Sequence, residues 1–258
     1  MKRAVLVLLV ACHAGGGGGD DYPTGTGGGG PIAVGGGTGD GGAGNAGVQI
    51  EGRVCLLKDL RHPTVCSGTG AGGLLVSLAT PTTKTAKVTT DDNGQFSIVA
   101  PLGAGFTWRV TGATDQRIVP SLMPFGTDHT IPVIGTEDYN TLLGANHQVI
   151  VDEGSVVVRV VSGGAPIPHV TVASTTLALE VAVKDAAFYD DDRSQDVWNQ
   201  TDTQSGGVVW IPVVALSPSP PTTGTITLAR QDGATVTTVT TAATVESQWI
   251  TFLTMNVP

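Results

Sequence analysis

The segment AKVTTDDNGQFSIV, residues 86–99, decides the fold of this chain. Two runs rich in Val, Ile, Thr and Phe flank the four turn-forming residues Asp91, Asp92, Asn93 and Gly94. β-Branched and aromatic side chains favour strands, and Asn and Gly tolerate the positive φ angles of a tight turn. The segment therefore predicts a β-hairpin.

Further strands are predicted on both sides of this hairpin. Residues 48–54 alternate apolar and polar side chains, which is the period of a half-buried strand. Similar runs, separated by turn residues, occur at 74–78, 106–111, 130–134, 155–161, 166–172, 208–211, 226–228 and 249–253. Short strands at this spacing are typical of sandwiches, in which alternate residues fill the space between two sheets. The sequence therefore predicts an all-β fold.

The second half of the chain repeats the order of the first. When Gly206 is set on Gly94, residues 201–211 align with residues 89–99. We therefore predict two tandem Ig-like or transthyretin-like antiparallel β-sandwiches after a disordered Gly-rich linker. The predicted organisation is a signal peptide (1–11), a lipidated Cys with a flexible tether (12–47), a first sandwich (48–134), a connector (135–153) and a second, divergent sandwich (154–258).

The connector is predicted to contain a short helix. Thr136 is suited to cap its start, because a Thr hydroxyl can accept from a free backbone N–H, and Gly144 is suited to end it. Each half carries its own set of strands and has the length of an ordinary domain. We therefore expect the two halves to fold as separable domains.

The order of motifs in the first half is similar to that of a known family. Gly52-Arg53-Val54, a strand near 72–78 and the run TDDNGQF at 90–96 resemble the carboxypeptidase regulatory-like domain. The resemblance covers roughly residues 48–134 and weakens from 154 onward, where Thr203 stands in place of the Asp and Val208 in place of the Phe. It implies a transthyretin-like sandwich that accompanies other proteins without catalysis, and it carries no active-site residues.

The amino terminus predicts export. Lys2 and Arg3 precede the apolar run 4–11, which is far shorter than the roughly 20 residues that span a bilayer. A basic start followed by a short apolar core is typical of a signal peptide. LVAC at residues 9–12 resembles the bacterial lipoprotein box, so Cys12 is expected to be acylated and to hold the chain on a membrane of the bacterial cell envelope, with the outer membrane as the expected location. The alternative is an ordinary secretory signal with an incidental Cys.

A glycine-rich tether is predicted to follow Cys12. More than half of residues 15–47 are Gly, and no apolar periodicity survives there. Ordering so much Gly costs more backbone entropy than its side chains could recover. The segment is therefore predicted to be a flexible linker. It could be a passive spacer or a segment that threads a cell-wall mesh.

The three Cys residues predict one disulfide. If Cys12 carries lipid, Cys55 and Cys66 remain as a pair in an oxidising compartment. Closing that loop would stabilise the fold by on the order of 3 kcal/mol in the chain-entropy model. Two buried, unpaired thiols are the alternative, and a zinc site is disfavoured because no second pair of ligands has the required spacing.

Two groups in the second half are candidate binding residues. Asp190, Asp191 and Asp192 form the densest charge cluster, which is either a weak calcium candidate or a solvated loop. Trp198 lies in a polar stretch and, with Tyr189, is a candidate for exposed ligand contact, as in modules that bind sugars. Two other tryptophans, Trp210 and Trp249, lie within strand runs and are predicted to be core residues.

Composition narrows the function. The formal net charge is −9 and only 14% of residues are charged, so the chain can neutralise few phosphates and nucleic acid is not an expected partner. No His pair has zinc-peptidase spacing and no Ser lies in a G-x-S-x-G elbow, so we expect no catalytic residues and no cofactor. The expected function is a non-catalytic binding or scaffolding module for an envelope protein or glycan. A structural spacer, a surface adhesin, and a hydrolase that uses the acidic loop are the alternatives.

Overall fold

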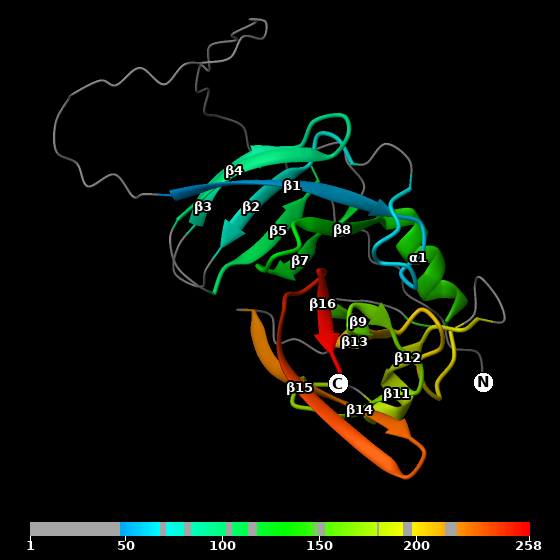
Figure 1. The fold of residues 1–258 in the computed structure, drawn as a ribbon. Coiled ribbons are helices and arrows are strands. Elements are labelled where there is room, and N and C mark those ends of the chain that lie inside the picture. Colours follow the sequence, from blue (N-terminus) through cyan, green and yellow to red (C-terminus); the bar gives the residue numbers. More distant parts are fainter. Residues whose placement is uncertain are drawn as a thin grey trace, which may run out of the picture. The chain divides into compact units, whose positions relative to one another are not determined.

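Strands dominate the structure, which confirms the predicted all-β fold (Figure 1). The computed structural model describes residues 47–67, 71–79, 84–101, 105–112, 118–146, 148, 153–179, 181–192, 198–214 and 221–258. Cys12, the predicted signal peptide and the predicted tether up to residue 46 lie outside the described residues. Neither helix in the described part is long and apolar enough to cross a membrane.

The first sandwich is built from residues between 47 and 135. Sheet A has the order β4 (Gln95–Pro101), β1 (Gly47–Leu57), β8 (Thr130–Gly135) and β6 (Ile118–Val119). The facing strands are β3 (Lys84–Thr89), β2 (Leu75–Ala79), β5 (Thr107–Thr111) and β7 (Ser121–Pro124). The predicted hairpin at residues 86–99 is therefore wrong, because its turn connects two facing sheets: β3 pairs with β2 and β4 pairs with β1. Alternate residues of both layers fill the core, where Phe96 and Trp108 meet edge to face at 5.3 Å between ring centres.

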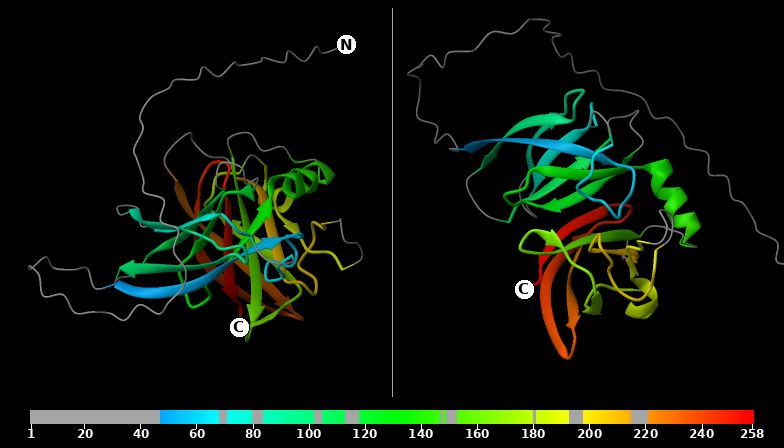
Figure 2. Two further views of the ribbon diagram at one scale, coloured as in Figure 1. Left: turned by 90° about the horizontal axis from the view of Figure 1, so that it is seen from above. Right: turned by 45° about the vertical axis from the view of Figure 1, so that its right-hand side comes forward.

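The second sandwich follows the same plan. One layer has the order β12 (Phe188–Tyr189), β13 (Val208–Val214), β9 (Gly154–Ser162) and β16 (Ile250–Asn256), with β10 (Ala165–Pro166) paired to β9. Sheet C faces it with β11 (Val170–Thr175), β14 (Thr222–Asp232) and β15 (Thr235–Val245), and the last two form the long orange hairpin in Figure 2. A short helix, α2 (Val183–Ala186), packs near β11.

The two sandwiches share a sheet. β7 of the first pairs in parallel with β16 of the second, in the register Ser121 to Ile250 and Leu122 to Thr251. This ladder makes a nine-stranded sheet B that runs β12-β13-β9-β16-β7-β5-β2-β3 through both sandwiches. The sequence patterns predict purely antiparallel sandwiches, whereas β1–β8, β9–β16 and β7–β16 are parallel.

Equivalent threonines show that the halves are structural repeats. In the first half the hydroxyl of Thr90 donates to the carbonyl of Ala71 at 2.7 Å. In the second half the hydroxyl of Thr203 donates to the carbonyl of Ile167 at 3.0 Å. Each hydroxyl also accepts the backbone N–H three residues beyond that carbonyl. Thr203 therefore corresponds to Thr90, and the alignment of Thr203 with the Asp of the motif is wrong.

Two glycines with positive φ fix the same register. The carbonyl of Gly94 accepts the N–H of Val54 at 2.7 Å, and the carbonyl of Gly207 accepts the N–H of Val160 at 2.7 Å. Gly94 has φ 77° and Gly207 has φ 61°. The repeat therefore aligns Gly207 with Gly94, one residue away from the predicted alignment on Gly206.

A third core lies where the halves meet. Helix α1 (Thr136–Ala145) buries Tyr139 and Leu143 against it. Leu57 and Leu60 enter it from the first half, and Trp210 and Phe252 enter it from the second, with other buried residues. The helix itself was predicted, but the residue preceding it is Gly135, Thr136 makes no cap, and the helix continues past Gly144.

Candidate binding pocket

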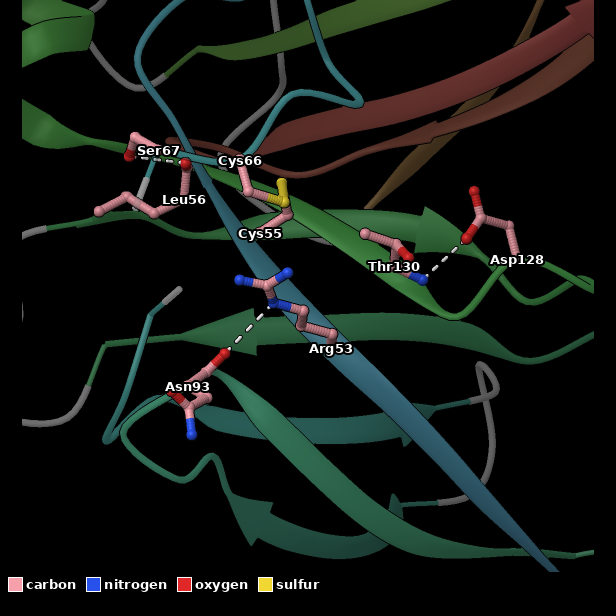
Figure 3. The surroundings of a disulfide bond; sticks show 8 residues. All are labelled: Arg53, Cys55, Leu56, Cys66, Ser67, Asn93, Asp128 and Thr130. Carbon is pink, nitrogen blue, oxygen red and sulfur yellow. Dashed lines mark hydrogen bonds between the residues drawn. A yellow bond between two sulfur atoms is a disulfide. The ribbon is translucent and has the colours of Figure 1, made fainter. Parts of the chain in front are cut away.

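The predicted disulfide is present. Cys55 and Cys66 are joined with an S–S distance of 2.11 Å at the end of β1, as Figure 3 shows. Next to it, the backbone N–H and the hydroxyl of Ser67 both donate to the carbonyl of Leu56, at 2.7 and 2.9 Å. The loop 58–67 is thus fastened to β1, and it brings Leu60 into the third core.

The predicted aromatic contact residues are buried. Trp198 is 6% exposed and Tyr189 is 3% exposed, so neither contributes to an exposed aromatic platform, and the expectation that Trp198 is exposed is wrong. Trp198 packs against Trp210 at 5.2 Å between ring centres. The hydroxyl of Tyr189 accepts the N–H of Val172 at 3.0 Å, and burial raises the pKa of Tyr189. Burial of large apolar area outweighs the polar neighbours of Trp198 in the sequence.

The acidic cluster has a structural role at Asp190. The Asp190 carboxylate accepts the backbone N–H groups of Gln204 (3.1 Å), Gly206 (2.8 Å) and Val208 (2.8 Å). Asp190 and its neighbour Asp191 are buried, so the prediction of a fully solvated loop is wrong for both. Burial is the largest cause of a raised Asp190 pKa, and the three backbone N–H groups act in the opposite direction.

No metal site is indicated in the part of the chain that the structure describes. No group of three or more His, Cys, Asp or Glu side chains is placed to hold a metal ion there. Asp192 is exposed and accepts from the hydroxyl of Ser205 at 2.6 Å, while the backbone carbonyl of Asp191 accepts from Arg61 at 3.4 Å. The three carboxylates therefore do not converge as a calcium site requires.

A cavity of about 500 Å³ lies where the two sandwiches meet. Helix α1 forms one wall with Tyr139, Asn140 and Leu143. The rest of the lining comes from Gln148, from β6 with Pro120, and from residues 248–250 at the start of β16. Because the cavity needs α1, the first sandwich and the second sandwich together, only the assembled tertiary structure creates it. Its size falls within the range of small-molecule sites, which often lie between structural units.

An aromatic side chain is held in a fixed position in this pocket. Trp249 is half-buried, and the guanidinium of Arg109 lies 4.3 Å from the centre of its ring. The two terminal nitrogens of Arg109, Nη1 and Nη2, each donate to one carboxylate oxygen of Glu246, the second at 2.6 Å. Arg109 belongs to β5 of the first half and Glu246 to the second, so a bidentate ion pair across the junction orients the indole ring.

The backbone beside Trp249 is strained. Gln248 has φ 63°, in the left-handed region that a residue with a Cβ rarely adopts. Its N–H donates to the carbonyl of Glu153 at 2.6 Å, and the N–H of Trp249 donates to the carbonyl of Glu246 at 3.1 Å. Such strain persists only where the surroundings enforce it, and it is concentrated at functional sites. Here it turns the side chains of Gln248 and Trp249 toward the pocket lining.

The polar groups of the pocket are neutral. Thr136, Asn140, Gln148 and Gln248 contribute a hydroxyl and three amides, and no residue that lines the cavity in the described part is charged. Amides both donate and accept hydrogen bonds, and so do the hydroxyls of an uncharged ligand. The lining therefore combines one indole ring, apolar walls and uncharged polar groups.

Sequence patterns place Trp249 in a strand of the core, and this prediction is wrong. Trp249 precedes β16, and β16 begins at Ile250. The polar run Glu246, Ser247 and Gln248 was the available signal, since it indicates a turn before the strand. Asn140 and Gln148 gave no signal, because nothing in their local sequence distinguishes a pocket residue from an exposed one.

The fold and the pocket define an all-β protein of two fused sandwiches with a neutral, aromatic-lined cavity at their junction. Comparison with known proteins identified no matching family model, no matching curated protein and no matching solved structure.

Proposed function

We propose that this protein is a lipid-anchored, non-catalytic binding module of the bacterial cell envelope, and that the junction pocket binds a neutral glycan. The observation that carries the proposal is the position of Trp249, fixed by Arg109 and bordered by uncharged amides in a cavity of about 500 Å³. The proposed transthyretin-like character of the first sandwich agrees with a companion module of envelope proteins.

The lining chemistry favours a glycan. An indole ring offers a flat apolar face for the C–H face of a sugar, and amides offer paired donors and acceptors for its hydroxyls. A charged ligand would lose its hydration without gaining an opposite charge from any described lining residue. A neutral oligosaccharide therefore fits this pocket better than a phosphate or an acidic peptide.

The same chemistry supports binding rather than catalysis. The described lining residues include no carboxylate, His, Cys or Lys, and burial raises the pKa of the lining Tyr139 to about 12, so its phenol stays protonated and is a poor general base. Asp190, the most strongly buried carboxylate of the acidic cluster, is engaged by three backbone N–H groups and is not among the lining residues.

The anchor can be tested at Cys12. Cys12→Ser should abolish incorporation of a fatty-acid probe into the full chain and release the protein from the membrane fraction, because the thiol is the proposed acylation site. Cys66→Ser is a control, since it removes another cysteine and opens the Cys55–Cys66 disulfide while leaving Cys12 intact, so it should be labelled like wild type. Equal labelling of wild type and Cys12→Ser would exclude the anchor and would leave the pocket proposal standing.

The pocket can be tested by glycan binding. Wild-type protein should bind soluble neutral oligosaccharides, with soluble glycan strands released from peptidoglycan as the first probe, and its Trp fluorescence should change. Trp249→Ala should weaken binding by about tenfold or more, because one stacked aromatic contact contributes roughly 1 kcal/mol beyond its buried area and an anchor residue contributes more.

Asn140→Ala should weaken binding as well, and Gln49→Ala is the control. Gln49 is an exposed amide that donates to Ser97 in the first sandwich and does not line the pocket. Unchanged affinity in Trp249→Ala, or no binding by wild type to any neutral glycan tested, would contradict the proposal and favour a spacer role.

A further inference from the structure

The free sheet edges of this protein differ sharply in how they are protected. Natural sheets block edge-to-edge association with lysines, bulges, proline or very short strands. Edge strand β3 carries the exposed Lys87, and β6 and β12 have two residues each. Edge strand β11 has an irregularity between Val172 and Ser174. β4 ends at Pro101 and contacts β3 across the sandwich.

β15 lacks these protections over most of its length, and only its end is covered by β16, where the Thr251 hydroxyl donates to the carbonyl of Thr244 at 2.6 Å. β15 is an 11-residue strand with the sequence TVTTVTTAATV, without charge and without proline. Its ladder with β14 is unbroken from Thr235, opposite Asp232, to Val245, opposite Thr222. Within the described residues its other edge has no strand partner, because β15 ends the order β11-β14-β15 of sheet C. Val236, at one end of this strand, is 61% exposed.

In the first sandwich, the strand equivalent to β15 pairs with a strand of the second sandwich. β5 pairs with β7 as β14 pairs with β15, so β7 and β15 occupy the same place in the two repeats. β7 uses its other edge for the parallel ladder with β16 that fuses the sandwiches. In the second repeat the equivalent edge belongs to β15 and has no strand partner among the described residues. β15 is also longer and more regular than β7.

We propose that β15 pairs with β15 of a second copy of this chain, in antiparallel orientation, and joins the two three-stranded sheets C into one continuous sheet. This self-association is independent of the proposed pocket. A two-fold axis brings the same strand of each copy together in antiparallel orientation, so one edge satisfies both partners. Overlap of residues 237–243, which leaves out the end covered by β16, places Thr240, the central residue, opposite its own counterpart.

The side chains of β15 suit such self-pairing. Thr238, Thr240 and Ala242 are exposed, uncharged and small, so two copies meet without like-charge repulsion. A different protein would have to supply an uncharged edge strand of its own. A second copy of this chain already carries one. Proteins tethered to one membrane also meet at a raised effective concentration, which favours pairing through a small contact.

The experiment compares two lysine substitutions that remove the same hydrogen bond. The hydroxyls of Thr227 and Thr240 lie 2.9 Å apart as a cross-strand pair, with Thr240 on the edge strand β15 and Thr227 on the central strand β14. Thr240→Lys places like charges at the proposed two-fold axis, whereas Thr227→Lys places the charge one strand away from it. Both variants should keep the wild-type circular dichroism spectrum.

Sedimentation velocity of the full chain in mild detergent, from micromolar to near-millimolar concentration, gives the result. Wild type and Thr227→Lys should form a species of twice the monomer mass, and Thr240→Lys should associate at least about tenfold more weakly. A wild type that stays monomeric at every concentration would overturn the proposal. So would a Thr240→Lys variant that dimerises as strongly as Thr227→Lys.

Discussion

Two carboxylates close equivalent turns from different positions in the chain. Asp91 lies within its own turn and accepts the N–H groups of Asn93 (2.9 Å) and Gln95 (2.8 Å). In the second repeat Gln204 takes the place of Asp91, and Asp190 reaches in from 14 residues earlier to accept the N–H groups of the same turn. In both repeats a carboxylate accepts the backbone N–H groups of the turn, but it comes from Asp91 within the turn in the first repeat and from the distant Asp190 in the second.

Removing these carboxylates should have unequal effects. Asp190→Ala leaves three N–H groups without an acceptor in a partly buried turn, so we expect it to lower the free energy of unfolding by about 2–4 kcal/mol. Asp91 is exposed and water can replace it, so Asp91→Ala should cost about 1 kcal/mol or less. Urea denaturation of both variants measures the difference. Equal losses would show that Asp190 does not carry the role proposed here.

At the scale of elements, each repeat has one left-handed glycine shortly before the strand that pairs with its first strand: Gly94 precedes β4, which pairs with β1, and Gly207 precedes β13, which pairs with β9. A Cβ on Gly207 would lie 2.6 Å from the carbonyl oxygen of Val160 and 2.8 Å from the nitrogen of Ile167. A Cβ on Gly94 meets the equivalent backbone atoms of the first repeat. Because the obstructing atoms belong to the backbone, no side-chain rotation can relieve the contact.

Gly207→Ala should therefore destabilise the protein more than an ordinary substitution at positive φ. We expect a loss of about 3 kcal/mol or more, from left-handed strain and backbone overlap together. Gly233→Ala is the control, since Gly233 has φ 59° and nothing lies within 4 Å of its would-be Cβ. It should lose only about 1–2 kcal/mol. Thermal unfolding followed by circular dichroism compares the two, and similar melting temperatures would contradict the overlap argument.

Two sets of contacts, one a strand ladder and the other a hydrophobic core, join the first half of the chain to the second. The β7–β16 ladder makes sheet B continuous, and the third core packs Leu57 and Leu60 of the first half against Trp210 and Phe252 of the second. The ion pair between Arg109 and Glu246 adds a polar contact across the same junction. All described residues accordingly fall within one compact unit, Gly44–Pro258.

Separation of the halves tests this coupling. Fragments 48–134 and 135–258 each retain a sandwich core of their own, but each exposes one side of the third core when it is alone. We expect both fragments to form β-sheet and to melt well below the 48–258 segment, because buried apolar area is lost at the cut. Circular dichroism melting measures this. Fragments that melt at the temperature of the longer segment would show that the junction contributes nothing to stability.

Local sequence was sufficient for much of the fold. The alternation in residues 48–54 and the Asx-Gly turn after Thr90 predict strands and a tight turn, because side-chain direction and φ preference are properties of a few neighbouring residues. They do not predict pairing, since β3 pairs with β2 and β4 pairs with β1 instead of with each other. The cysteine count predicts the Cys55–Cys66 disulfide for a similar reason, since few pairings are available. β15 was missed, because its mixture of Thr, Ala and Val shows no period of two.

Only the tertiary structure decided which residues are buried and which meet. Trp198 is buried and Trp249 lines a pocket, although their sequence contexts predict the reverse, because burial depends on elements that are distant along the chain. The shared sheet B, the reach of Asp190 into its turn and the junction pocket all join residues from both halves or from separate elements. The sequence by itself determined the strands, the repeat and the disulfide, and long-range packing determined the pocket and the open edge of β15.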